Sequence, residues 1–162
     1  MFNFFKKKKG LEVCAVADGE IMPITKVKDD VFSTKMLGDG YAIKPSNGDI
    51  FSPVDGTIST LFPTKHAIGV KTKDGLEILI HLGLDTVELK GAPFEVMVEQ
   101  GDEVKAGQQL ASMDLKQITD SGRDDSAIVV YTNMDIINSL DPEEVAEGNV
   151  SHGNQVQTIH FK

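Results

Sequence analysis

Short alternating runs of apolar and polar residues, separated by turn residues, dominate the chain. The turn signals are Asp18-Gly19, Gly38-Asp39-Gly40, Ser46-Asn47-Gly48, Asp55-Gly56, Asp74-Gly75, Gly101-Asp102 and Ala106-Gly107. Between them we expect strands that include residues 13–17, 41–44, 56–62, 94–98 and 128–131. Many short strands joined by closely spaced turns are typical of an antiparallel sandwich or barrel. The pattern therefore predicts an all-β fold, an antiparallel β-sandwich or barrel-like single domain with a few short helical turns.

Helical patterns are confined to two short segments. Residues 115–119 fit one or two turns, and Asn133 or Asp135 is placed to cap a short helix over residues 136–140, before Asp141-Pro142. No internal repeat, linker or low-complexity stretch divides the chain after Gly10. We therefore expect residues 11–162 to form one β-sandwich domain and residues 1–10 to form a flexible basic tail.

A β-hairpin predicted around Asp74-Gly75 carries two of the four histidines. An Asp-Gly pair between two runs rich in β-branched residues favours a two-residue turn, which places His81 opposite Ile68. Side chains then alternate between two faces. One face is expected to carry His66, Ile68, Val70, Leu79 and His81, and the other, the core face, Leu76, Ile78, Ile80 and Leu82. The two histidines become diagonal neighbours with Cα atoms roughly 7–8 Å apart, within reach of one small ligand group.

Composition and charge exclude several classes of protein. The 162 residues are 40% hydrophobic and 25% charged, as in ordinary soluble domains, and hold no run of 18 apolar residues that would span a membrane. No secretory signal is recognisable, and the lone Cys14 cannot form an internal disulfide, so we expect a cytoplasmic protein. We also expect the protein to be a monomer. A net charge of −9 argues against nucleic-acid binding and favours basic protein partners.

The first nine residues depart from this acidic balance. Three aromatic residues precede a run of lysines, in the order Phe2, Phe4, Phe5, Lys6, Lys7, Lys8 and Lys9. A solubilising tail is one interpretation. The alternative is a weak peripheral contact with the inner face of the membrane, in which aromatic rings enter the headgroup region and lysines meet anionic lipids.

The two adjacent histidines allow a phosphohistidine site. A neutral imidazole is a competent nucleophile near neutral pH if its other nitrogen holds its proton against a fixed acceptor. The carbonyl of Gly83 is a suitable acceptor for His81, because a residue without a side chain can approach the ring closely. His66 is then placed to donate a proton to the phosphoryl oxygens, and the hydroxyl of Thr64, two residues earlier, can fix its tautomer.

Two other functions remain open at this point. His81 and Asp85 form an H-x-x-x-D string, and with His66 they supply the three ligands of a zinc-dependent, peptidase-like hydrolase. The chain lacks the H-x-H sequence with which lysostaphin-type peptidases complete such a site. A non-catalytic binding module that uses the same face is the third interpretation. His152 and His160 are expected to be surface or strand residues without a functional role.

Several motifs together resemble the glucose-type enzyme IIA of the bacterial phosphoenolpyruvate-dependent sugar phosphotransferase system. The similarity follows the chain in order over residues 11–162. It is carried by Asp29-Asp30-Val31-Phe32, Lys35-Met36-Leu37-Gly38-Asp39-Gly40, Ala42-Ile43-Lys44-Pro45, Pro53-Val54-Asp55-Gly56-Thr57-Ile58, Thr64-Lys65-His66-Ala67, Ile80-His81-Leu82-Gly83-Leu84-Asp85-Thr86-Val87-Glu88-Leu89-Lys90-Gly91 and Asn133-Met134-Asp135.

The resemblance implies a β-sandwich that accepts a phosphoryl group from phosphorylated HPr and passes it to a cysteine of the IIB domain of a sugar permease. His81 matches the phosphorylated histidine, Gly83 the carbonyl that binds its Nδ1, His66 the second active-site histidine and Thr64 the hydroxyl that orients it. Asp29 and Asp85 match carboxylates that pair with basic partner residues. No cofactor is required, although in some relatives the two histidines share a zinc ion across a partner interface.

A phosphoryl relay also needs an apolar patch on which two different proteins dock and from which water is excluded. We expect Phe32 and Leu79 to be exposed beside the histidines, since Leu79 shares the predicted face of His81. The full set expected to form this patch is Val31, Phe32, Met36, Leu37, Phe62, Ile68, Val70 and Leu79.

Overall fold

A computed structural model describes residues 10–162, and this part of the chain folds into three antiparallel sheets. The largest sheet has the strand order β13 (Gly148–Val150), β2 (Gly19–Pro23), β3 (Asp39–Pro45), β11 (Ala127–Tyr131), β7 (Glu77–Leu82), β6 (Ala67–Lys71), β5 (Gly56–Leu61), β9 (Glu103–Val104). One small sheet contains β4 (Asp49–Phe51), β10 (Gln109–Met113) and β8 (Phe94–Val96), and the other contains β1 (Leu11–Cys14), β14 (Gln155–Phe161) and β12 (Ile137–Asp141). The predicted antiparallel β-sandwich is confirmed.

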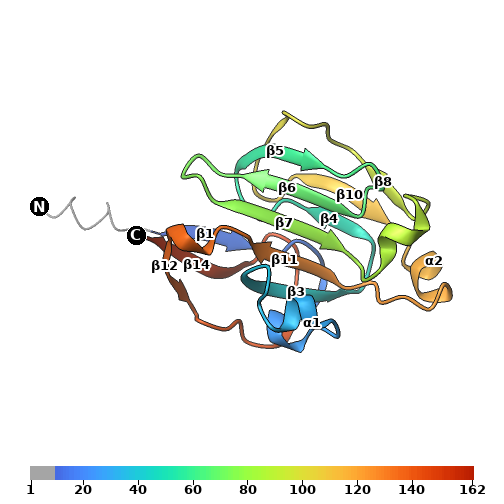
Figure 1. Ribbon diagram of the computed structural model, residues 1–162, viewed down its shortest axis with the longest axis horizontal. Helices are drawn as coiled ribbons and strands as arrows, with labels where there is room; N and C mark the ends of the chain where they lie inside the picture. Colours follow the sequence, from blue (N-terminus) through green and yellow to red (C-terminus); the bar gives the residue numbers. More distant parts are fainter. Residues whose placement is uncertain (1–9) are drawn as a thin grey trace, which may run out of the picture.

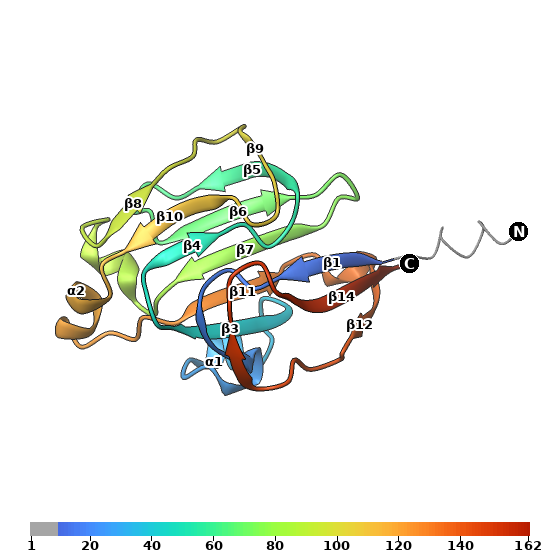
Figure 2. The ribbon, with the colours of Figure 1, turned by 180° about the vertical axis from the view of Figure 1, so that it is seen from behind.

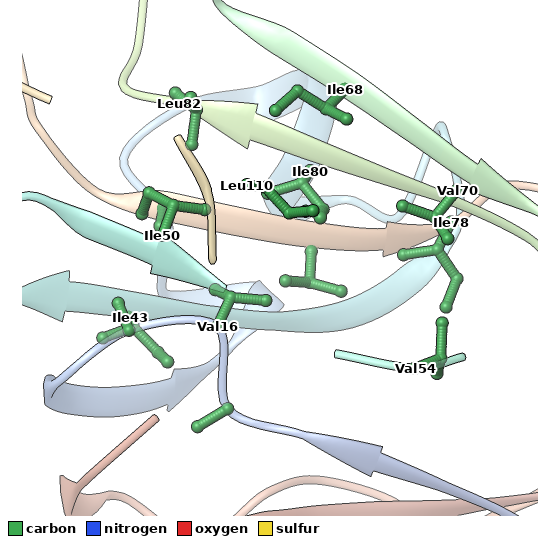
Figure 3. Close-up of a cluster of buried hydrophobic side chains, with 14 of the residues drawn as sticks. Val16, Ile43, Ile50, Val54, Ile68, Val70, Ile78, Ile80, Leu82 and Leu110 are labelled. Carbon is green, nitrogen blue, oxygen red and sulfur yellow. The ribbon is translucent and has the colours of Figure 1, made fainter. Parts of the chain in front are cut away.

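The two small sheets cover one face of the large sheet, as the views from the two sides show (Figures 1 and 2). The main hydrophobic core fills the space between these layers (Figure 3). Ile50 of β4 and Leu110 of β10 are completely buried there with Ile80 of β7. Leu76, Ile78, Ile80 and Leu82, the expected core residues of the hairpin, all lie in this core.

The opposite face of the large sheet carries the short helix α1 (Asp30–Ser33) and the 3₁₀ turn η2 (Ile24–Lys26) (Figure 1). Beneath them is a smaller cluster, the second core, which consists of Ile24, Val27, Phe32, Ala42, Leu84, Ile128 and Val130. Strand β11 is consequently buried on both faces, which explains its uninterrupted apolar sequence Ala-Ile-Val-Val-Tyr.

The predicted strands are confirmed within a few residues, but only one of the two predicted helices forms. Helix α2 (Leu115–Asp120) begins at Asp114, whose carboxylate accepts a hydrogen bond from the Gln117 amide at 3.0 Å. The helix expected over residues 136–140 is wrong, because η4 (Met134–Ile136) leads directly into strand β12. Asn133 does not cap a helix, since its side chain binds the Glu77 amide and the Gly75 carbonyl, each at 2.8 Å.

The register of the β6–β7 hairpin differs by one residue from the predicted one. Ala67 lies opposite His81 and Ile68 opposite Ile80. The loop is longer than the Asp-Gly pair predicts, because the Thr72 hydroxyl accepts a hydrogen bond from the Leu76 amide at 3.2 Å and the two backbones pair there. The shift turns Ile68 toward the main core instead of the histidine face.

The basic tail predicted over residues 1–10, with its possible membrane contact, lies outside the described residues except for Gly10. The domain boundary at residue 11 therefore stays a prediction. Among the described residues, none of the helices has the length and apolar character needed to cross a bilayer.

Candidate functional site

His81 lies on β7, on the face of the large sheet that carries the second core. Its neighbours across the sheet are Ala67 on β6 and Ile128 on β11. The ring of Phe32, from α1, meets the imidazole edge-on with a centroid distance of 5.1 Å and an angle of 61°. The His81 side chain is half-buried, so the strand and α1 together hold the ring while part of it remains accessible.

A hydrogen bond fixes the tautomer of His81. Nδ1 of the ring lies 2.8 Å from the carbonyl oxygen of Gly83. Because a carbonyl oxygen only accepts, Nδ1 must carry the proton, and Nε2 keeps its lone pair. Gly83 adopts a φ of +79°, and a Cβ at this position would lie 2.5 Å from Thr86 Cγ2 and 2.9 Å from the Asp124 carbonyl oxygen. Only glycine fits this conformation and this space.

Replacing Gly83 by alanine is expected to lower the free energy of unfolding by roughly 2–5 kcal/mol, the sum of left-handed strain and overpacking. Gly122 is a matched control, because its φ is +83° and a Cβ added there would have no neighbouring atom within 4 Å. Gly122→Ala should therefore cost only the strain, about 1 kcal/mol. Urea unfolding of both variants measures the difference, and equal losses would contradict the close packing at Gly83.

His66 lies one residue before β6, so the alternation of that strand does not extend to it. The preceding residue, Lys65, has a left-handed φ of 60°. His66 is 8% exposed, and the centroid of its ring lies 5.2 Å from that of the His81 ring, at an interplanar angle of 76°. The expected adjacency of the two rings is present, although the register from which we predicted it is wrong.

Two neighbours hold the His66 ring. The Thr64 hydroxyl lies 2.5 Å from Nδ1, and the Phe62 ring meets the imidazole edge-on at a centroid distance of 5.2 Å. If the hydroxyl donates this hydrogen bond, Nε2 of His66 carries the ring proton. The structure therefore brings together Thr64, His66, His81 and Gly83, four of the residues that the sequence singled out.

Burial keeps both imidazoles neutral. Desolvation lowers the pKa of His81, and His66 lowers it further, whereas the Gly83 hydrogen bond and the carboxylates of Asp29 and Asp85 raise it by less. Desolvation also lowers the pKa of His66. At neutral pH the Nε2 lone pair of His81 is consequently available for attack on an electrophile.

The lowered pKa values predict that acid destabilises the fold. Below a pH of about 6.5 the unfolded chain binds protons at these two histidines more readily than the folded chain does, so stability falls as the pH drops through the folded-state pKa values. Urea unfolding from about pH 7.5 to about pH 5 should show a larger loss for the wild type than for the variant His66→Gln, His81→Gln. Parallel curves for the two proteins would contradict this expectation.

The carboxylates of Asp29 and Asp85 lie close enough to His81 to raise its pKa. Asp29 begins α1, and its carboxylate accepts a hydrogen bond from the Val31 amide at 2.9 Å. Asp85 is exposed and has a left-handed φ of 59°. Val31, Met36 and Leu37 of the predicted apolar patch are 41%, 72% and 40% exposed.

Three members of the predicted apolar patch are buried. Ile68 and Val70 have no exposed surface because the observed register places them in the main core, so their expected exposure is wrong. Phe32 is only 6% exposed, because α1 turns it into the second core and against His81. Leu79 is half-buried against the second core, and Phe62 is half-buried against His66.

The ligand set of a zinc hydrolase is not assembled. Within residues 10–162, no three His, Cys, Asp or Glu side chains gather closely enough to hold a metal ion, so His66, His81 and Asp85 do not form the expected triad. Two imidazoles alone leave a zinc ion short of ligands. A zinc site completed by residues of a partner protein stays a prediction.

Residues 123–126 also reach the site, and the sequence did not indicate them. The Arg123 side chain donates a hydrogen bond to the Asp85 carbonyl oxygen at 3.1 Å, and the Gly83 amide donates to the Ser126 carbonyl at 2.8 Å. These residues follow His81 by about forty positions, and only the pairing of β11 with β7 brings them close. No local motif marks such a contact.

Comparisons with known proteins agree with this geometry. Residues 11–137 match the family model of the phosphoenolpyruvate-dependent sugar phosphotransferase system, EIIA 1. A PTS system glucose-specific EIICBA component from Streptococcus pneumoniae is 53% identical over 133 residues, which cover 82% of this chain and 18% of that relative. The solved structure of the glucose permease IIA from Mycoplasma capricolum has a TM-score of 0.84 and 44% identity, and the match covers 93% of this chain and 96% of that one.

Proposed function

The chain belongs to the glucose-type EIIA family of the phosphoenolpyruvate-dependent sugar phosphotransferase system, and we propose that it accepts a phosphoryl group from phospho-HPr on His81 and passes it to a cysteine of the IIB domain of a sugar permease. The observation that carries this proposal is the hydrogen bond from His81 Nδ1 to the Gly83 carbonyl, which leaves Nε2 as a neutral nucleophile.

In the first step, the lone pair of His81 Nε2 attacks the phosphorus atom of the phosphorylated donor. A bond from Nε2 to phosphorus forms, and the bond from phosphorus to the donor breaks, with its electron pair returning to the donor. The ring then carries a positive charge, which the nearby carboxylates of Asp29 and Asp85 stabilise, since both favour the charged form of His81. The Gly83 carbonyl keeps the Nδ1 proton in place throughout.

In the second step, a thiolate of the IIB domain attacks the same phosphorus atom. The bond to His81 Nε2 breaks, and its electron pair returns to the ring, which regains its neutral form. His66 supports this transfer, because its ring lies beside His81 and its Nε2 proton can bind a phosphoryl oxygen when Thr64 donates to Nδ1.

The surface near His81 is suited to the docking of the two partner proteins, one after the other. Val31 in α1 and Met36 and Leu37 just after it expose apolar surface, and the same helix places Phe32 against His81. Partners that cover this surface would exclude water from the phosphorylated ring. Asp29 and Asp85 repel phosphate but attract basic residues, in agreement with the net charge of −9. We infer that they select basic partner surfaces.

The test of this function is reconstitution of the relay. The protein is incubated with phosphoenolpyruvate, enzyme I and HPr, and the adduct is located by mass spectrometry. We expect one phosphoryl group on His81 that is labile in acid and stable in base, and that disappears when a IIB domain is added. Absence of an adduct, or an adduct on another residue, would refute the proposal.

A further inference from the structure

The loop that follows β7 is held by a distant segment, residues 123–126, which we call the clamp. The Gly83 amide donates to the Ser126 carbonyl at 2.8 Å, and the Leu84 amide donates to the Asp124 carbonyl at 2.9 Å. Arg123 Nε donates to the Asp85 carbonyl at 3.1 Å. Three consecutive residues of the loop are thus bound to the clamp, which fixes the direction of the Gly83 carbonyl.

The clamp is itself anchored by two side chains. Asp125 forms an ion pair with Lys44 of β3, and the Asp125 side chain is only 5% exposed. The Arg123 guanidinium also binds Glu88 in η3 (Thr86–Leu89) at 2.7 Å, so it joins the clamp to the last residue of the loop and to the 3₁₀ turn that follows. Within the clamp, the Ser126 amide donates to the Asp124 carboxylate at 2.8 Å.

We propose that Arg123 and Asp125 are positioning residues for the phosphorylation of His81, acting through the clamp and the Gly83 carbonyl. This inference rests on the proposed function of His81. The chemical reason is the tautomer of the ring. Without a fixed carbonyl at Nδ1, the proton can move to Nε2, and an Nε2 that carries a proton has no lone pair with which to attack phosphorus.

The first test measures the tautomer of His81 in the unphosphorylated protein, by the ¹⁵N chemical shifts of its ring at a pH where the ring is neutral. Wild type should show a single tautomer with the proton on Nδ1. Arg123→Gln and Asp125→Asn should show a mixture of the two tautomers, and Arg123→Lys, which keeps a donor for the Asp85 carbonyl, should restore part of the Nδ1–H form.

The matched control is Asp120→Asn, which removes an ion pair with Lys116 on α2, where the Asp120 side chain is 63% exposed. This variant should retain the wild-type tautomer. A pure Nδ1–H tautomer in Arg123→Gln would overturn the proposal. Because the Arg123 side chain lies near the surface, we expect this variant to fold, so the test remains possible even if Asp125→Asn does not fold.

The second test separates the chemical step from docking. In phosphorylation by phospho-HPr, Arg123→Gln and Asp125→Asn should lower kcat roughly 10–100-fold, the usual effect of losing a group that orients a reactive histidine, while KM stays within about twofold of wild type. A rise in KM with unchanged kcat would make Arg123 a docking residue and overturn its positioning role. If wild type accepts no phosphoryl group, the proposed function fails, and the tautomer measurement still decides on the clamp.

Discussion

His81→Ala is expected to accept no phosphoryl group from phospho-HPr. The variant lacks the Nε2 nitrogen that the Gly83 hydrogen bond to Nδ1 keeps available as a neutral nucleophile, and the remaining methyl group cannot form a bond to phosphorus. Incubation with radiolabelled phosphoenolpyruvate, enzyme I and HPr measures incorporation directly. We expect labelling at the level of a reaction without HPr.

The control for this experiment is His152→Ala. His152 stacks on Phe51 with a centroid distance of 3.7 Å and pairs with Asp18 at 2.8 Å, and it belongs to none of the contacts around His81. This variant should incorporate the label as wild type does. Full labelling of His81→Ala would refute the assignment of the phosphorylated residue.

His66→Gln is expected to accept the phosphoryl group but to transfer it onward roughly 100–1,000-fold more slowly, the usual effect of losing one donor that stabilises charge in a transition state. Glutamine removes the imidazole that lies beside His81 and binds Thr64. The measurement is a single turnover, in which phosphorylated protein is mixed with a purified IIB domain and loss of the label is followed with time.

The two steps must be compared in the same variant. Acceptance from phospho-HPr within about tenfold of wild type, together with slow transfer to IIB, agrees with a role of His66 in the second step. Equal losses in both steps would contradict that role and indicate that His66 shapes the whole site. Rapid transfer to IIB would show that His66 has no part in the relay.

The turn signals and the alternation of side chains are enough to predict the fold class and the residues of β7 that face the main core. They do not predict the hairpin register, because the Thr72 side chain binds the backbone at Leu76 and the loop is one residue longer than the Asp-Gly pair indicates. A one-residue shift exchanges the two faces of a strand. The two-residue turn that the sequence predicts therefore places Ile68 and Val70 on the wrong side of the sheet.

The hairpin pattern predicts that the two histidines are adjacent, and they are, but the hairpin register that it predicts is wrong. In the observed register, strict alternation would place His66 on the face opposite to His81, but His66 precedes the strand and follows Lys65 in a left-handed conformation. Such a local turn leaves no clear signal in the sequence, since lysine rarely adopts it. Motif similarity identified the pair more securely than periodicity did.

The burial of Phe32 and the contribution of residues 123–126 follow from tertiary packing. Nothing near Phe32 in the sequence shows that α1 lies against the sheet and turns the ring toward His81. Residues 123–126 are polar and follow a short helix, so the sequence indicates an ordinary surface loop. Their role depends on β11 lying next to β7.

The pairing of β1 with β14 brings the two ends of the domain together, since Leu11 lies opposite Ile159. Figure 1 shows both ends at one extremity of the molecule, whereas β7 runs toward the other. A linker attached at either end would thus tether the domain at the extremity away from the one toward which β7, the strand of His81, runs. Flexible linkers of moderate length hold tethered modules at effective concentrations of about millimolar. The same domain is therefore suited to act either as a diffusing carrier or as a covalently attached arm.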